Sequence, residues 1–402
     1  MKRDHGWILT LIWVMVVVGV AATTITLMIS NANSGSHFVT DEQMKILDRY
    51  ARLEAVHSTL VKDYYQPVDE DALMLGAIRG MMASLGDPYT FYYTPEELAE
   101  HDRSTTGEYY GVGLLLQNNA NAEIEIIRVY ADSPAERGGA RVGDIVKTIN
   151  GVAASGKNAQ TLSEAANRMR GKEGEILKLT VLREGKELNL EMEHAEVLVS
   201  NISCTLMDGD VGYIGIFQFS GDDVDAFREA LRNLPEKGAR SLIIDVRNNP
   251  GGLLDDVTAI ADMLLPEVCV VYTENRDGRR TDYYSDADCC DLPLCVLVNG
   301  MSASASEILA AAIQDTERGT IVGTQTYGKG IVQSLLTFES DEAGMQYTSE
   351  RYFTPSGKCI HGVGVTPDVI VEGDLPRSIY EGVPNPSDDP QLSEALKILR
   401  GA

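Results

Sequence analysis

The chain carries little positive charge, few histidines and no cysteine pattern of the kind that binds zinc. Its 60 acidic residues outnumber 34 basic ones, which gives a formal net charge of −26. A field of this sign repels phosphate backbones, so nucleic acid is excluded as a partner. The six cysteines show no paired C-x-x-C spacing and no H-E-x-x-H segment occurs. We therefore expect neither a metal site nor a cofactor.

Cysteine pairing is left open by the sequence. A chain of 402 residues is long enough to bury a core without disulfides. In an oxidising compartment, the adjacent Cys289 and Cys290 would still be able to form disulfides with other cysteines. Free thiols and disulfides therefore both fit the sequence.

One long run near the N-terminus has no charge at all. Residues 7–29 are 23 positions without Asp, Glu, Lys or Arg, and a helix of that length reaches about 35 Å, enough for a hydrocarbon core of ~30 Å. Lys2 and Arg3 precede the run, so an anchor leaves residues 1–6 in the cytosol. A cleaved signal peptide is the alternative, because Ser30-Asn31-Ala32 resembles a cleavage site. We expect a single-pass protein of the cell membrane with its bulk outside the cytosol, or a secreted protein if the segment is cleaved.

Helical spacing dominates the next segment, which we assign to residues 38–103. Apolar side chains recur at helical intervals from Met44 to Leu60 and from Leu73 to Met82. Gly86-Asp87-Pro88 ends the second run. Thr94 followed by proline then predicts the start of another helix, with the threonine as its N-cap.

Short strand patterns take over in residues 104–195. Runs such as Ile124–Ile127 and Leu177–Val181 alternate with turns, and one helix is expected near residues 162–169. The pattern predicts a compact, mostly β domain. Before its first strand, the loop Gly111-Val112-Gly113 presents consecutive N–H groups that are able to hold the C-terminal carboxylate of a peptide. A lone Gly-x-Gly is weak evidence for such a site.

Strands that alternate with helices fill residues 196–374. The runs Leu242–Val246 and Leu294–Val298 are each followed by a helical pattern, and a further strand is expected at Val268–Tyr272. This alternation favours βαβ units and a largely parallel sheet. Residues 375–402 are a Pro/Asp-rich tail that ends in a short helix.

A serine-rich turn follows the strand Leu294–Val298, at the point where a helix begins. Its sequence is Ser302-Ala303-Ser304-Ala305-Ser306. Backbone N–H groups at a helix N-terminus stabilise an anion, including the oxyanion that forms when a serine attacks a carbonyl group. The alternative is that these serines only cap the helix and pack. The segment alone does not decide which serine is the nucleophile.

A lysine is the best candidate for the base. Lys329 lies between two glycines, and desolvation would lower its pKa far enough for it to accept a proton. Gln333 is four residues further on, an offset that returns to the same face of a strand, so its amide oxygen is placed to orient the amine. A second glycine-containing segment follows a buried strand, Asn249-Pro250-Gly251-Gly252. It is either a second source of N–H donors for an oxyanion or an ordinary strand-to-helix turn.

Two other interpretations of these residues are weaker. Gly323 to Lys329 matches the start of a P-loop, but Gly330 stands where the magnesium-binding Ser/Thr belongs and a strand pattern follows. A Ser-His-Asp triad needs a histidine, and only His361, in a glycine-rich loop, is placed to approach a site.

Several ordered motifs carry a family resemblance. In chain order they are Gly86-Asp87-Pro88-Tyr89, Tyr110-Gly111-Val112-Gly113, Asp245 to Gly252, Ser302 to Glu307, Thr326 to Gln333 and Gly364-Val365-Thr366-Pro367-Asp368. Together they resemble a carboxyl-terminal processing protease, a serine peptidase of family S41 with an embedded PDZ domain. The resemblance covers nearly everything after residue 30.

The resemblance implies roles for individual residues. The nucleophile falls on Ser304, the base on Lys329 and the lysine-orienting residue on Gln333. The implied oxyanion donors are the N–H of Ala305 and one from the pair Gly251-Gly252.

The resemblance also implies a fold. The expected chain is an α+β multidomain protein, with a ClpP/crotonase-like α/β protease core and an inserted, mostly β PDZ domain. An N-terminal helical region and a transmembrane helix at residues 7–29 precede them. The peptide-binding loop of the PDZ domain falls on Gly111, Val112 and Gly113.

We therefore predict a membrane-anchored, extracytoplasmic serine endopeptidase that cuts the C-terminal tails of exported or membrane proteins after PDZ capture. The alternative is a catalytically inactive scaffold protein with the same folds. An acyl-CoA enzyme is disfavoured, because no CoA-binding signature occurs.

Apolar faces at residues 41–85 and 392–399 would pack either in a homodimer or within one chain. Arg170 is the residue expected to couple the PDZ domain to the core.

Overall fold

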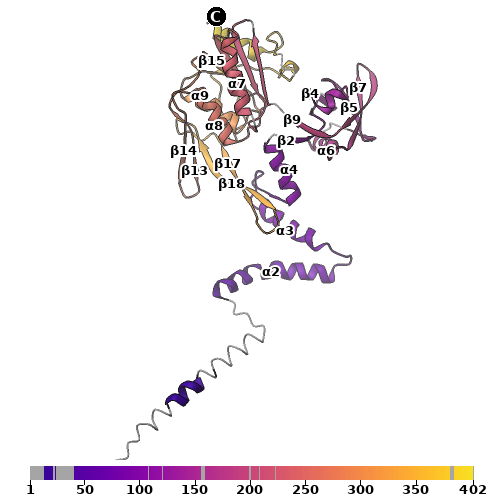
Figure 1. Cartoon of the computed structure of the whole chain (residues 1–402), viewed down its shortest axis with the longest axis vertical. Helices are drawn as coiled ribbons and strands as arrows, with labels where there is room; N and C mark the ends of the chain where they lie inside the picture. The colour runs from indigo at the N-terminus through magenta and orange to yellow at the C-terminus, as the bar shows by residue number, and fades with distance from the viewer. Residues whose placement is uncertain are drawn as a thin grey trace, which may run out of the picture. The chain divides into compact units, whose positions relative to one another are not determined.

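A computed structural model gives the fold of the chain (Figure 1). It divides into two units, Met1–Met81 and Met82–Ala402. The structure describes residues 13–20, 23, 40–106, 108–119, 121–154, 159–198, 201–207, 209–221, 223–380 and 384–401.

The first unit is helical where it is described. Helix α2 (Asp41–Asp63) starts at a capping box, in which Thr40 and Gln43 exchange hydrogen bonds of 3.2 and 2.9 Å. Helix α3 (Glu70–Ala83) follows it in sequence. None of the residues of α2 is buried, and most of its apolar side chains are exposed, while Leu60 is half-buried. The predicted dimer stays a prediction.

The predicted transmembrane helix is not supported by this structure. Within the described residues, no helix is both long enough and apolar enough to cross a bilayer. Most of the segment 7–29 lies outside the described residues, which here are 13–20 and 23.

The prediction that helices fill residues 38–103 is correct only in part. A short strand, β1 (Phe91–Tyr93), pairs antiparallel with a distant strand of the second unit. Helix α4 (Pro95–Thr106) then begins where the Thr-Pro pair predicts. Thr94 and Glu97 form its capping box, with bonds of 3.3 and 2.9 Å. Local periodicity missed β1 because its partner strand is far away in sequence.

A mostly β domain follows, as predicted. Its main sheet has the order β3-β4-β5-β7-β8, and β6 pairs with β5. Strands β2 and β9 pair with each other, and helices α5 and α6 complete the domain. The bounds are β2 Glu108–Gly111, β3 Leu114–Asn118, β4 Ile124–Val129, α5 Pro134–Arg137, β5 Ile145–Ile149, β6 Val152–Ala153, α6 Ala159–Met169, β7 Ile176–Arg183, β8 Lys186–Glu193 and β9 Ala195–Leu198.

The α/β core is built on a six-stranded sheet of order β10-β11-β12-β15-β16-β19. All its neighbouring pairs are parallel except β10 with β11, which confirms the predicted largely parallel sheet. The bounds are β10 Ile202–Met207, β11 Val211–Ile216, α7 Asp223–Glu236, β12 Ser241–Asp245, α8 Leu254–Asp262, β15 Leu294–Val298, α9 Ala305–Asp315, β16 Thr320–Gly323, β19 Val369–Ile370 and α10 Pro390–Arg400. The 3-10 helix η1 (Arg377–Ile379) lies between the last two.

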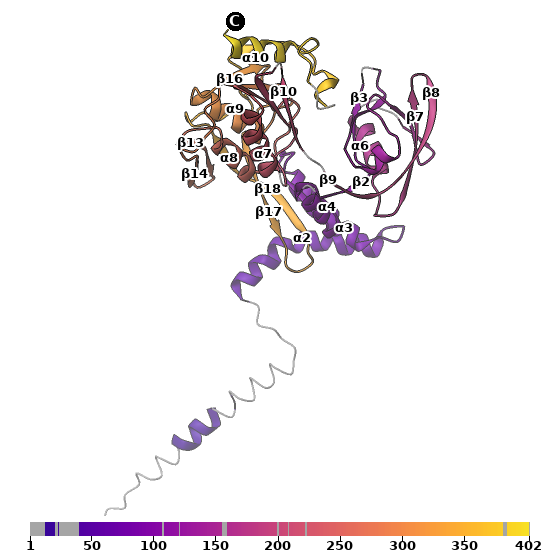
Figure 2. The same ribbon diagram turned by 45° about the horizontal axis from the view of Figure 1, so that its top comes forward.

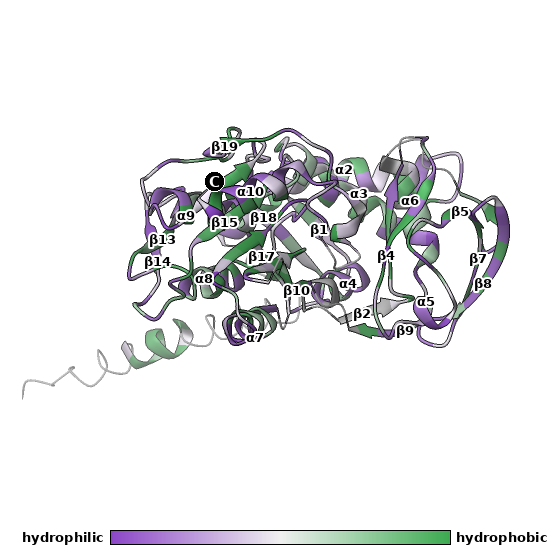
Figure 3. Ribbon diagram, turned by 90° about the horizontal axis from the view of Figure 1, so that it is seen from above, coloured by the Kyte–Doolittle hydropathy of each residue, from purple (hydrophilic) through white to green (hydrophobic). Residues whose placement is uncertain are grey.

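Both faces of this sheet are covered, which explains its continuous hydrophobic strands. Val296 and Val298 of β15 point into a core shared with α7, α8 and α9. Cys295 and Leu297 point the other way, against Leu392 and its neighbours on α10. Figure 2 shows α10 beside β16, and Figure 3 shows β15 coloured as hydrophobic. A strand buried on both sides has no polar face.

A second, antiparallel sheet holds a strand that the sequence assigned to the parallel one. The predicted strand Val268–Tyr272 is β13 (Cys269–Asn275), which pairs with β14 (Arg280–Tyr284) and β18 (Gly344–Phe353). β18 also pairs with β17 (Ile331–Thr337) and with β1. The strand is present, but strand propensity does not specify its partner strand.

All six cysteines of the chain are free thiols.

A buried ionic network ties the C-terminal helix to the end of β12. Arg247 donates to Asp245 at 2.6 Å and to Asp389 at 2.7 Å, and all three side chains are nearly inaccessible. Burial alone would lower the pKa of Arg247, but Asp245 and Asp389 raise it overall. Asp389 is also the N-cap of α10, accepting from Leu392 N at 3.0 Å. One side chain therefore fixes both the helix start and the loop after β12.

Replacement of Asp389 by alanine is expected to lower the free energy of unfolding by about 3–5 kcal/mol, because the buried Arg247 loses one of its two carboxylate partners. Urea unfolding followed by circular dichroism measures the change. Asp388→Ala, at the exposed neighbour, is the control and is expected to stay within about 0.5 kcal/mol of the parent chain. Equal effects from the two variants would contradict the role given to the network.

Candidate active site

The turn between β15 and α9 places Ser304 in an unusual backbone conformation. Ser304 is the N-cap of α9 with φ 57° and ψ −116°. A non-glycine residue at positive φ is strained, and such strain persists where the surroundings enforce it. The side chain is thereby presented at the first turn of a helix, next to unpaired N–H groups.

The other two serines of the turn have structural roles. Ser302 Oγ donates to the carbonyl of Val246 at 2.7 Å, and Ser306 Oγ donates to that of Asn249 at 2.9 Å. Both are 0% exposed. They bind the turn to the segment after β12, and Ser304 is left as the only partly accessible serine of the three.

The carboxylate of Glu307 joins the serine segment to the lysine segment. Its Oε2 accepts from Ser304 N at 2.9 Å and from Lys329 N at 2.8 Å. Its Oε1 accepts from Thr326 Oγ1 at 2.5 Å and from Gly328 N at 2.7 Å. Glu307 is 0% exposed. No role was predicted for Glu307, although its position three residues after Ser304, as in a capping box, was an available signal.

The side chain of Lys329 lies against an aromatic ring. Its Nζ is 4.5 Å from the centroid of the Tyr89 ring. Burial lowers the pKa of Lys329, and the charges of Asp87 and Glu307 oppose this without reversing it. Among the described residues no hydrogen bond joins Lys329 Nζ to Ser304 Oγ. The two backbones are brought together, while the amine is held at Tyr89.

Gln333 lies on the serine side instead. It lines the same cavity as Ser304, and its Nε2 is buried without a hydrogen-bond partner in the described structure. The pairing of β17 with β18 shifts register between Val332 and Gln333. The extra residue of this bulge is Ser349 on β18, so the alternation along β17 is kept. Among the described residues no hydrogen bond joins the side chains of Gln333 and Lys329.

The two glycines after β12 have different neighbours. Gly251 N donates to Asn249 Oδ1 at 2.8 Å, so this N–H is already used. Gly252 lines the cavity with Ser304 and Ala305. A Cβ at Gly252 would lie 1.9 Å from the carbonyl oxygen of Phe219, and its φ is 150°, so only glycine fits. A Cβ at Gly251 would lie 2.7 Å from Ser304 Cβ and 3.0 Å from Ala305 N, so both predicted glycines border the serine turn.

Ser304, Gly252 and Gln333 line a cavity of about 370 Å³, and its lining is mainly apolar. Aliphatic side chains come from α8, α9 and β17. Polar groups come from His101 and Asp102 of α4. The lining residues are His101, Asp102, Gln218, Phe219, Ser220, Gly252, Leu253, Leu254, Ser304, Ala305, Ile308, Ile331, Val332, Gln333, Leu335, Gln346 and Tyr352.

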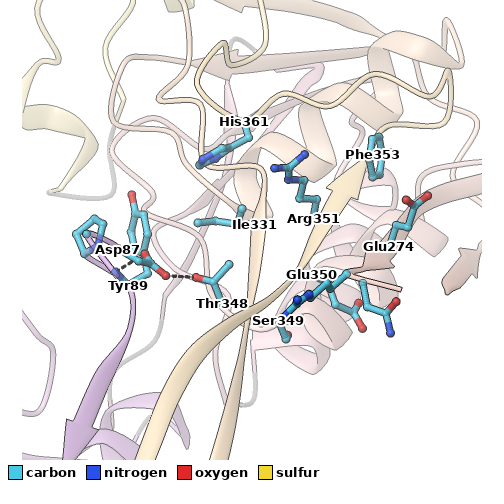
Figure 4. A pocket seen from close by; sticks show the side chains of 14 residues that line it. Asp87, Tyr89, Glu274, Ile331, Thr348, Ser349, Glu350, Arg351, Phe353 and His361 are labelled. Carbon is cyan, nitrogen blue, oxygen red and sulfur yellow. Dashed lines mark hydrogen bonds between the residues drawn. The ribbon is translucent and has the colours of Figure 1, made fainter. Parts of the chain in front are cut away.

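The histidines differ from the prediction in one respect. His361, the expected candidate, accepts from Gly330 N at 3.4 Å and lines a larger cavity of about 810 Å³ that meets the first at Ile331 (Figure 4). His101, which the sequence analysis did not single out, lines the cavity of Ser304 and stacks on Tyr93 at 5.0 Å. Pattern alone missed His101 because α4 is far from Ser304 in sequence.

The predicted peptide-binding loop lies in the mostly β domain. The carbonyls of Val112 and Gly113 accept from Ala135 N at 2.7 Å and from Tyr130 N at 3.1 Å, and Gly111 ends β2.

Arg170, the residue expected to couple the PDZ domain to the core, forms an ion pair outside the loop: its Nη1 is 3.7 Å from Glu100 Oε1 on α4. Across the residues that the structure covers, no group of acidic, histidine or cysteine side chains is arranged to hold a metal ion.

Comparison with known proteins finds relatives over most of the chain. The family model for peptidase family S41 matches residues 210–371, the PDZ domain model matches 125–183, and the activating protease CtpB N-terminal domain model matches 16–97. The carboxyl-terminal-processing protease of Synechocystis sp. is 41% identical over 335 residues, which are 81% of this chain and 76% of that protein. The carboxy-terminal-processing protease of Bartonella bacilliformis is 33% identical over 404 residues, covering 90% of this chain and 91% of that protein.

A solved structure gives the same result for the fold. The photosystem II D1 C-terminal processing protease is 30% identical, with a TM-score of 0.55, and the match covers 86% of this chain and 97% of that one.

Glu307→Gln is expected to loosen the contact between the serine and lysine segments. An amide offers one oxygen where the carboxylate has two, so two of the four donors then face an NH2 group, at a cost of about 1–3 kcal/mol for each unsatisfied donor. The expected result is a lower free energy of unfolding and faster amide exchange in peptides that contain Ser304 and Lys329. Glu339→Gln, at an exposed position, is the control. Unchanged exchange in the Glu307 variant would show that its carboxylate does not hold the two segments.

Proposed function

The chain belongs to peptidase family S41, as a carboxyl-terminal-processing protease that carries a PDZ domain, and we propose that Ser304 and Lys329 are its catalytic dyad. The observation that carries the proposal is the shared carboxylate of Glu307, which binds the backbone N–H groups of both residues at 2.9 and 2.8 Å. A serine in a strained N-cap and a lysine of lowered pKa are thereby kept in two adjoining segments.

The proposed reaction has two steps of acyl transfer. Neutral Lys329 accepts the proton of Ser304 Oγ, and the oxygen attacks the scissile carbonyl carbon. The N–H groups of Ala305 and Gly252, which line the same cavity, stabilise the oxyanion. Collapse breaks the C–N bond, the leaving amine takes the proton from Lys329, and an acyl-enzyme remains. Water, deprotonated by Lys329, then releases the new carboxyl terminus.

The lysine must move for this reaction to occur. Its amine lies over Tyr89, whereas Gln333 has a buried amide without a partner in the Ser304 cavity. We assign Gln333 the role of orienting the amine once Lys329 turns toward Ser304, with its amide oxygen accepting a hydrogen bond from Lys329 Nζ.

The proposed substrate is the C-terminal tail of an exported or membrane protein. The aliphatic lining of the cavity supports an apolar side chain next to the cut. The loop Gly111–Gly113 of the PDZ domain is proposed to hold the chain end.

Ser304→Ala and Lys329→Ala are each expected to reduce kcat/KM for an unfolded substrate with an apolar C-terminus by at least about 1000-fold, since each removes a reacting group. Mass spectrometry of the products measures both the rate and the position of the cut. Ser340→Ala and Lys358→Ala, at exposed positions, are the matched controls. Turnover by either Ser304 or Lys329 variant within tenfold of the parent would overturn the dyad, and no cleavage by the parent chain would favour the inactive scaffold.

We also propose that residues 7–29 anchor the chain in the cell membrane with its catalytic part outside the cytosol. The uncharged run and the preceding Lys2 and Arg3 support this orientation. The chain is expected in the carbonate-resistant membrane fraction, and deletion of residues 1–30 is expected to move it to the soluble fraction. A mature N-terminus directly after Ala32 would show instead that the segment is a cleaved signal peptide.

A further inference from the structure

The turn between α3 and β1 lies against the amine of Lys329, and nothing in the proposed reaction uses it. We propose that Tyr89 and Asp87 of this turn are positioning residues that hold the protonated amine of Lys329 and set its proton affinity. The inference rests on the proposed dyad of Ser304 and Lys329. It gives the lysine two positions, one at Tyr89 and one at Ser304.

Asp87 fastens the turn to the ribbon that carries Gln333. Its carboxylate accepts from Tyr89 N at 2.9 Å, from Thr90 Oγ1 at 2.7 Å and from Thr348 Oγ1 at 2.6 Å. Figure 4 shows Asp87 between Tyr89 and Thr348, with dashed lines for the bonds to both. Thr348 of β18 is the register partner of Gln333 on β17. The turn is therefore fixed relative to the residue that would receive the amine during catalysis.

Tyr89 presents the face of its ring to the lysine. A ring face attracts an ammonium group but not a neutral amine, because its electrostatic field is negative. A hydrogen bond with Tyr327 is the main reason why the pKa of Tyr89 is raised to about 12. The ring therefore stays a neutral phenol at ordinary pH. Tyr327 is two residues before Lys329, so the same pair of tyrosines connects the turn to the lysine segment.

The charged and titratable groups around the amine act in opposite directions. Burial lowers the pKa of Lys329, while the carboxylates of Asp87 and Glu307 raise it. For Asp87, burial raises the pKa, but bonds from Thr348, Thr90 and Tyr89 N and the charge of His361 lower it overall. Tyr352, whose hydroxyl donates to the carbonyls of Ser304 and Lys329, is also next to the lysine segment, and burial raises its pKa well above the usual value. Asp87 therefore stays charged and Tyr89 and Tyr352 stay neutral, and His361 is the imidazole that faces Asp87.

The sign of the effect follows from these contacts. Asp87 and the Tyr89 ring favour the ammonium form, so removing either lowers the pKa of Lys329. A general base acts in its neutral form, and the acid limb of kcat/KM against pH reports its pKa in the free enzyme. Weakening the turn must therefore move that limb to lower pH. A residue that only supports the fold would lower kcat/KM at every pH without moving the limb.

The experiment measures kcat/KM against pH for the full chain, for three variants of the turn and for one control variant. Tyr89→Leu removes the ring, and Asp87→Asn removes the charge with little change in shape. Each is expected to shift the acid limb down by about half to one pH unit, the size of one cation–π or partly screened charge contact. Tyr89→Phe keeps the ring face and is expected to keep the limb within about 0.2 pH unit. Tyr284→Leu, the same change at a 66% exposed tyrosine, is the control for substitution alone.

Three outcomes would overturn the inference. One is an unmoved acid limb in both Tyr89→Leu and Asp87→Asn, with circular dichroism showing that both are folded. Another is an upward shift, which would mean that the turn favours the neutral amine. A third is loss of the limb in His361→Gln, which would assign the titration to the histidine. Full activity of Lys329→Ala would instead refute the dyad itself, so failure of the inference and failure of the proposed function are distinguishable.

A second readout does not depend on turnover. The rate at which a fluorophosphonate labels Ser304 reports the same base, because the serine must lose its proton to react. Its pH dependence is expected to shift with the Tyr89 and Asp87 variants as kcat/KM does. Labelling rates with unshifted pH dependence in both variants would contradict the proposed role.

Discussion

One buried carboxylate holds this site together. Glu307, in the first turn of α9, accepts from the backbone N–H groups of Ser304, Gly328 and Lys329 and from the hydroxyl of Thr326. A carboxylate out of contact with water is tolerated only where donors surround it, and four donors at a helix N-terminus meet that condition. The same bonds fix the distance between a serine segment and a lysine segment that come from different parts of the chain. Glu307 therefore determines where both lie.

Neighbouring segments hold the turn in which the backbone of Ser304 is strained. Ser302 and Ser306 bind the carbonyls of Val246 and Asn249, so the turn is attached to the loop after β12. That loop is fixed in turn by Arg247, which joins β12 to the C-terminal helix through Asp389. A chain of buried polar contacts thus runs from α10 to Ser304. Such contacts are strong only when all are satisfied, which is why a distant helix affects the geometry of the turn.

The N-terminal part of the second unit completes the site from outside the α/β core. Strand β1 pairs with β18 and brings the turn that contains Asp87 and Tyr89 beside Lys329. Helix α4, which follows, contributes His101 and Asp102 to the cavity of Ser304. The amine of Lys329 lies at Tyr89, and the amide nitrogen of Gln333, which has no partner among the described residues, lies at the cavity of Ser304.

Local patterns in the sequence were sufficient to predict most of the helices and strands, though not β1, and to find the motif that contains Ser304 and Lys329. The strand Leu294–Val298, the helix that begins directly after Ser304 and the capped helix at Pro95 lie where spacing and capping residues predict them, because side-chain period and N-cap chemistry act over a few residues. Only the tertiary structure decided that β13 joins the antiparallel sheet, that Gly251 N is bonded to Asn249 Oδ1, and that Gln333 lines the cavity of Ser304. It also decided that Glu307 and Tyr89 contact the lysine segment. These outcomes depend on which distant group accepts each hydrogen bond, and no local spacing contains that information.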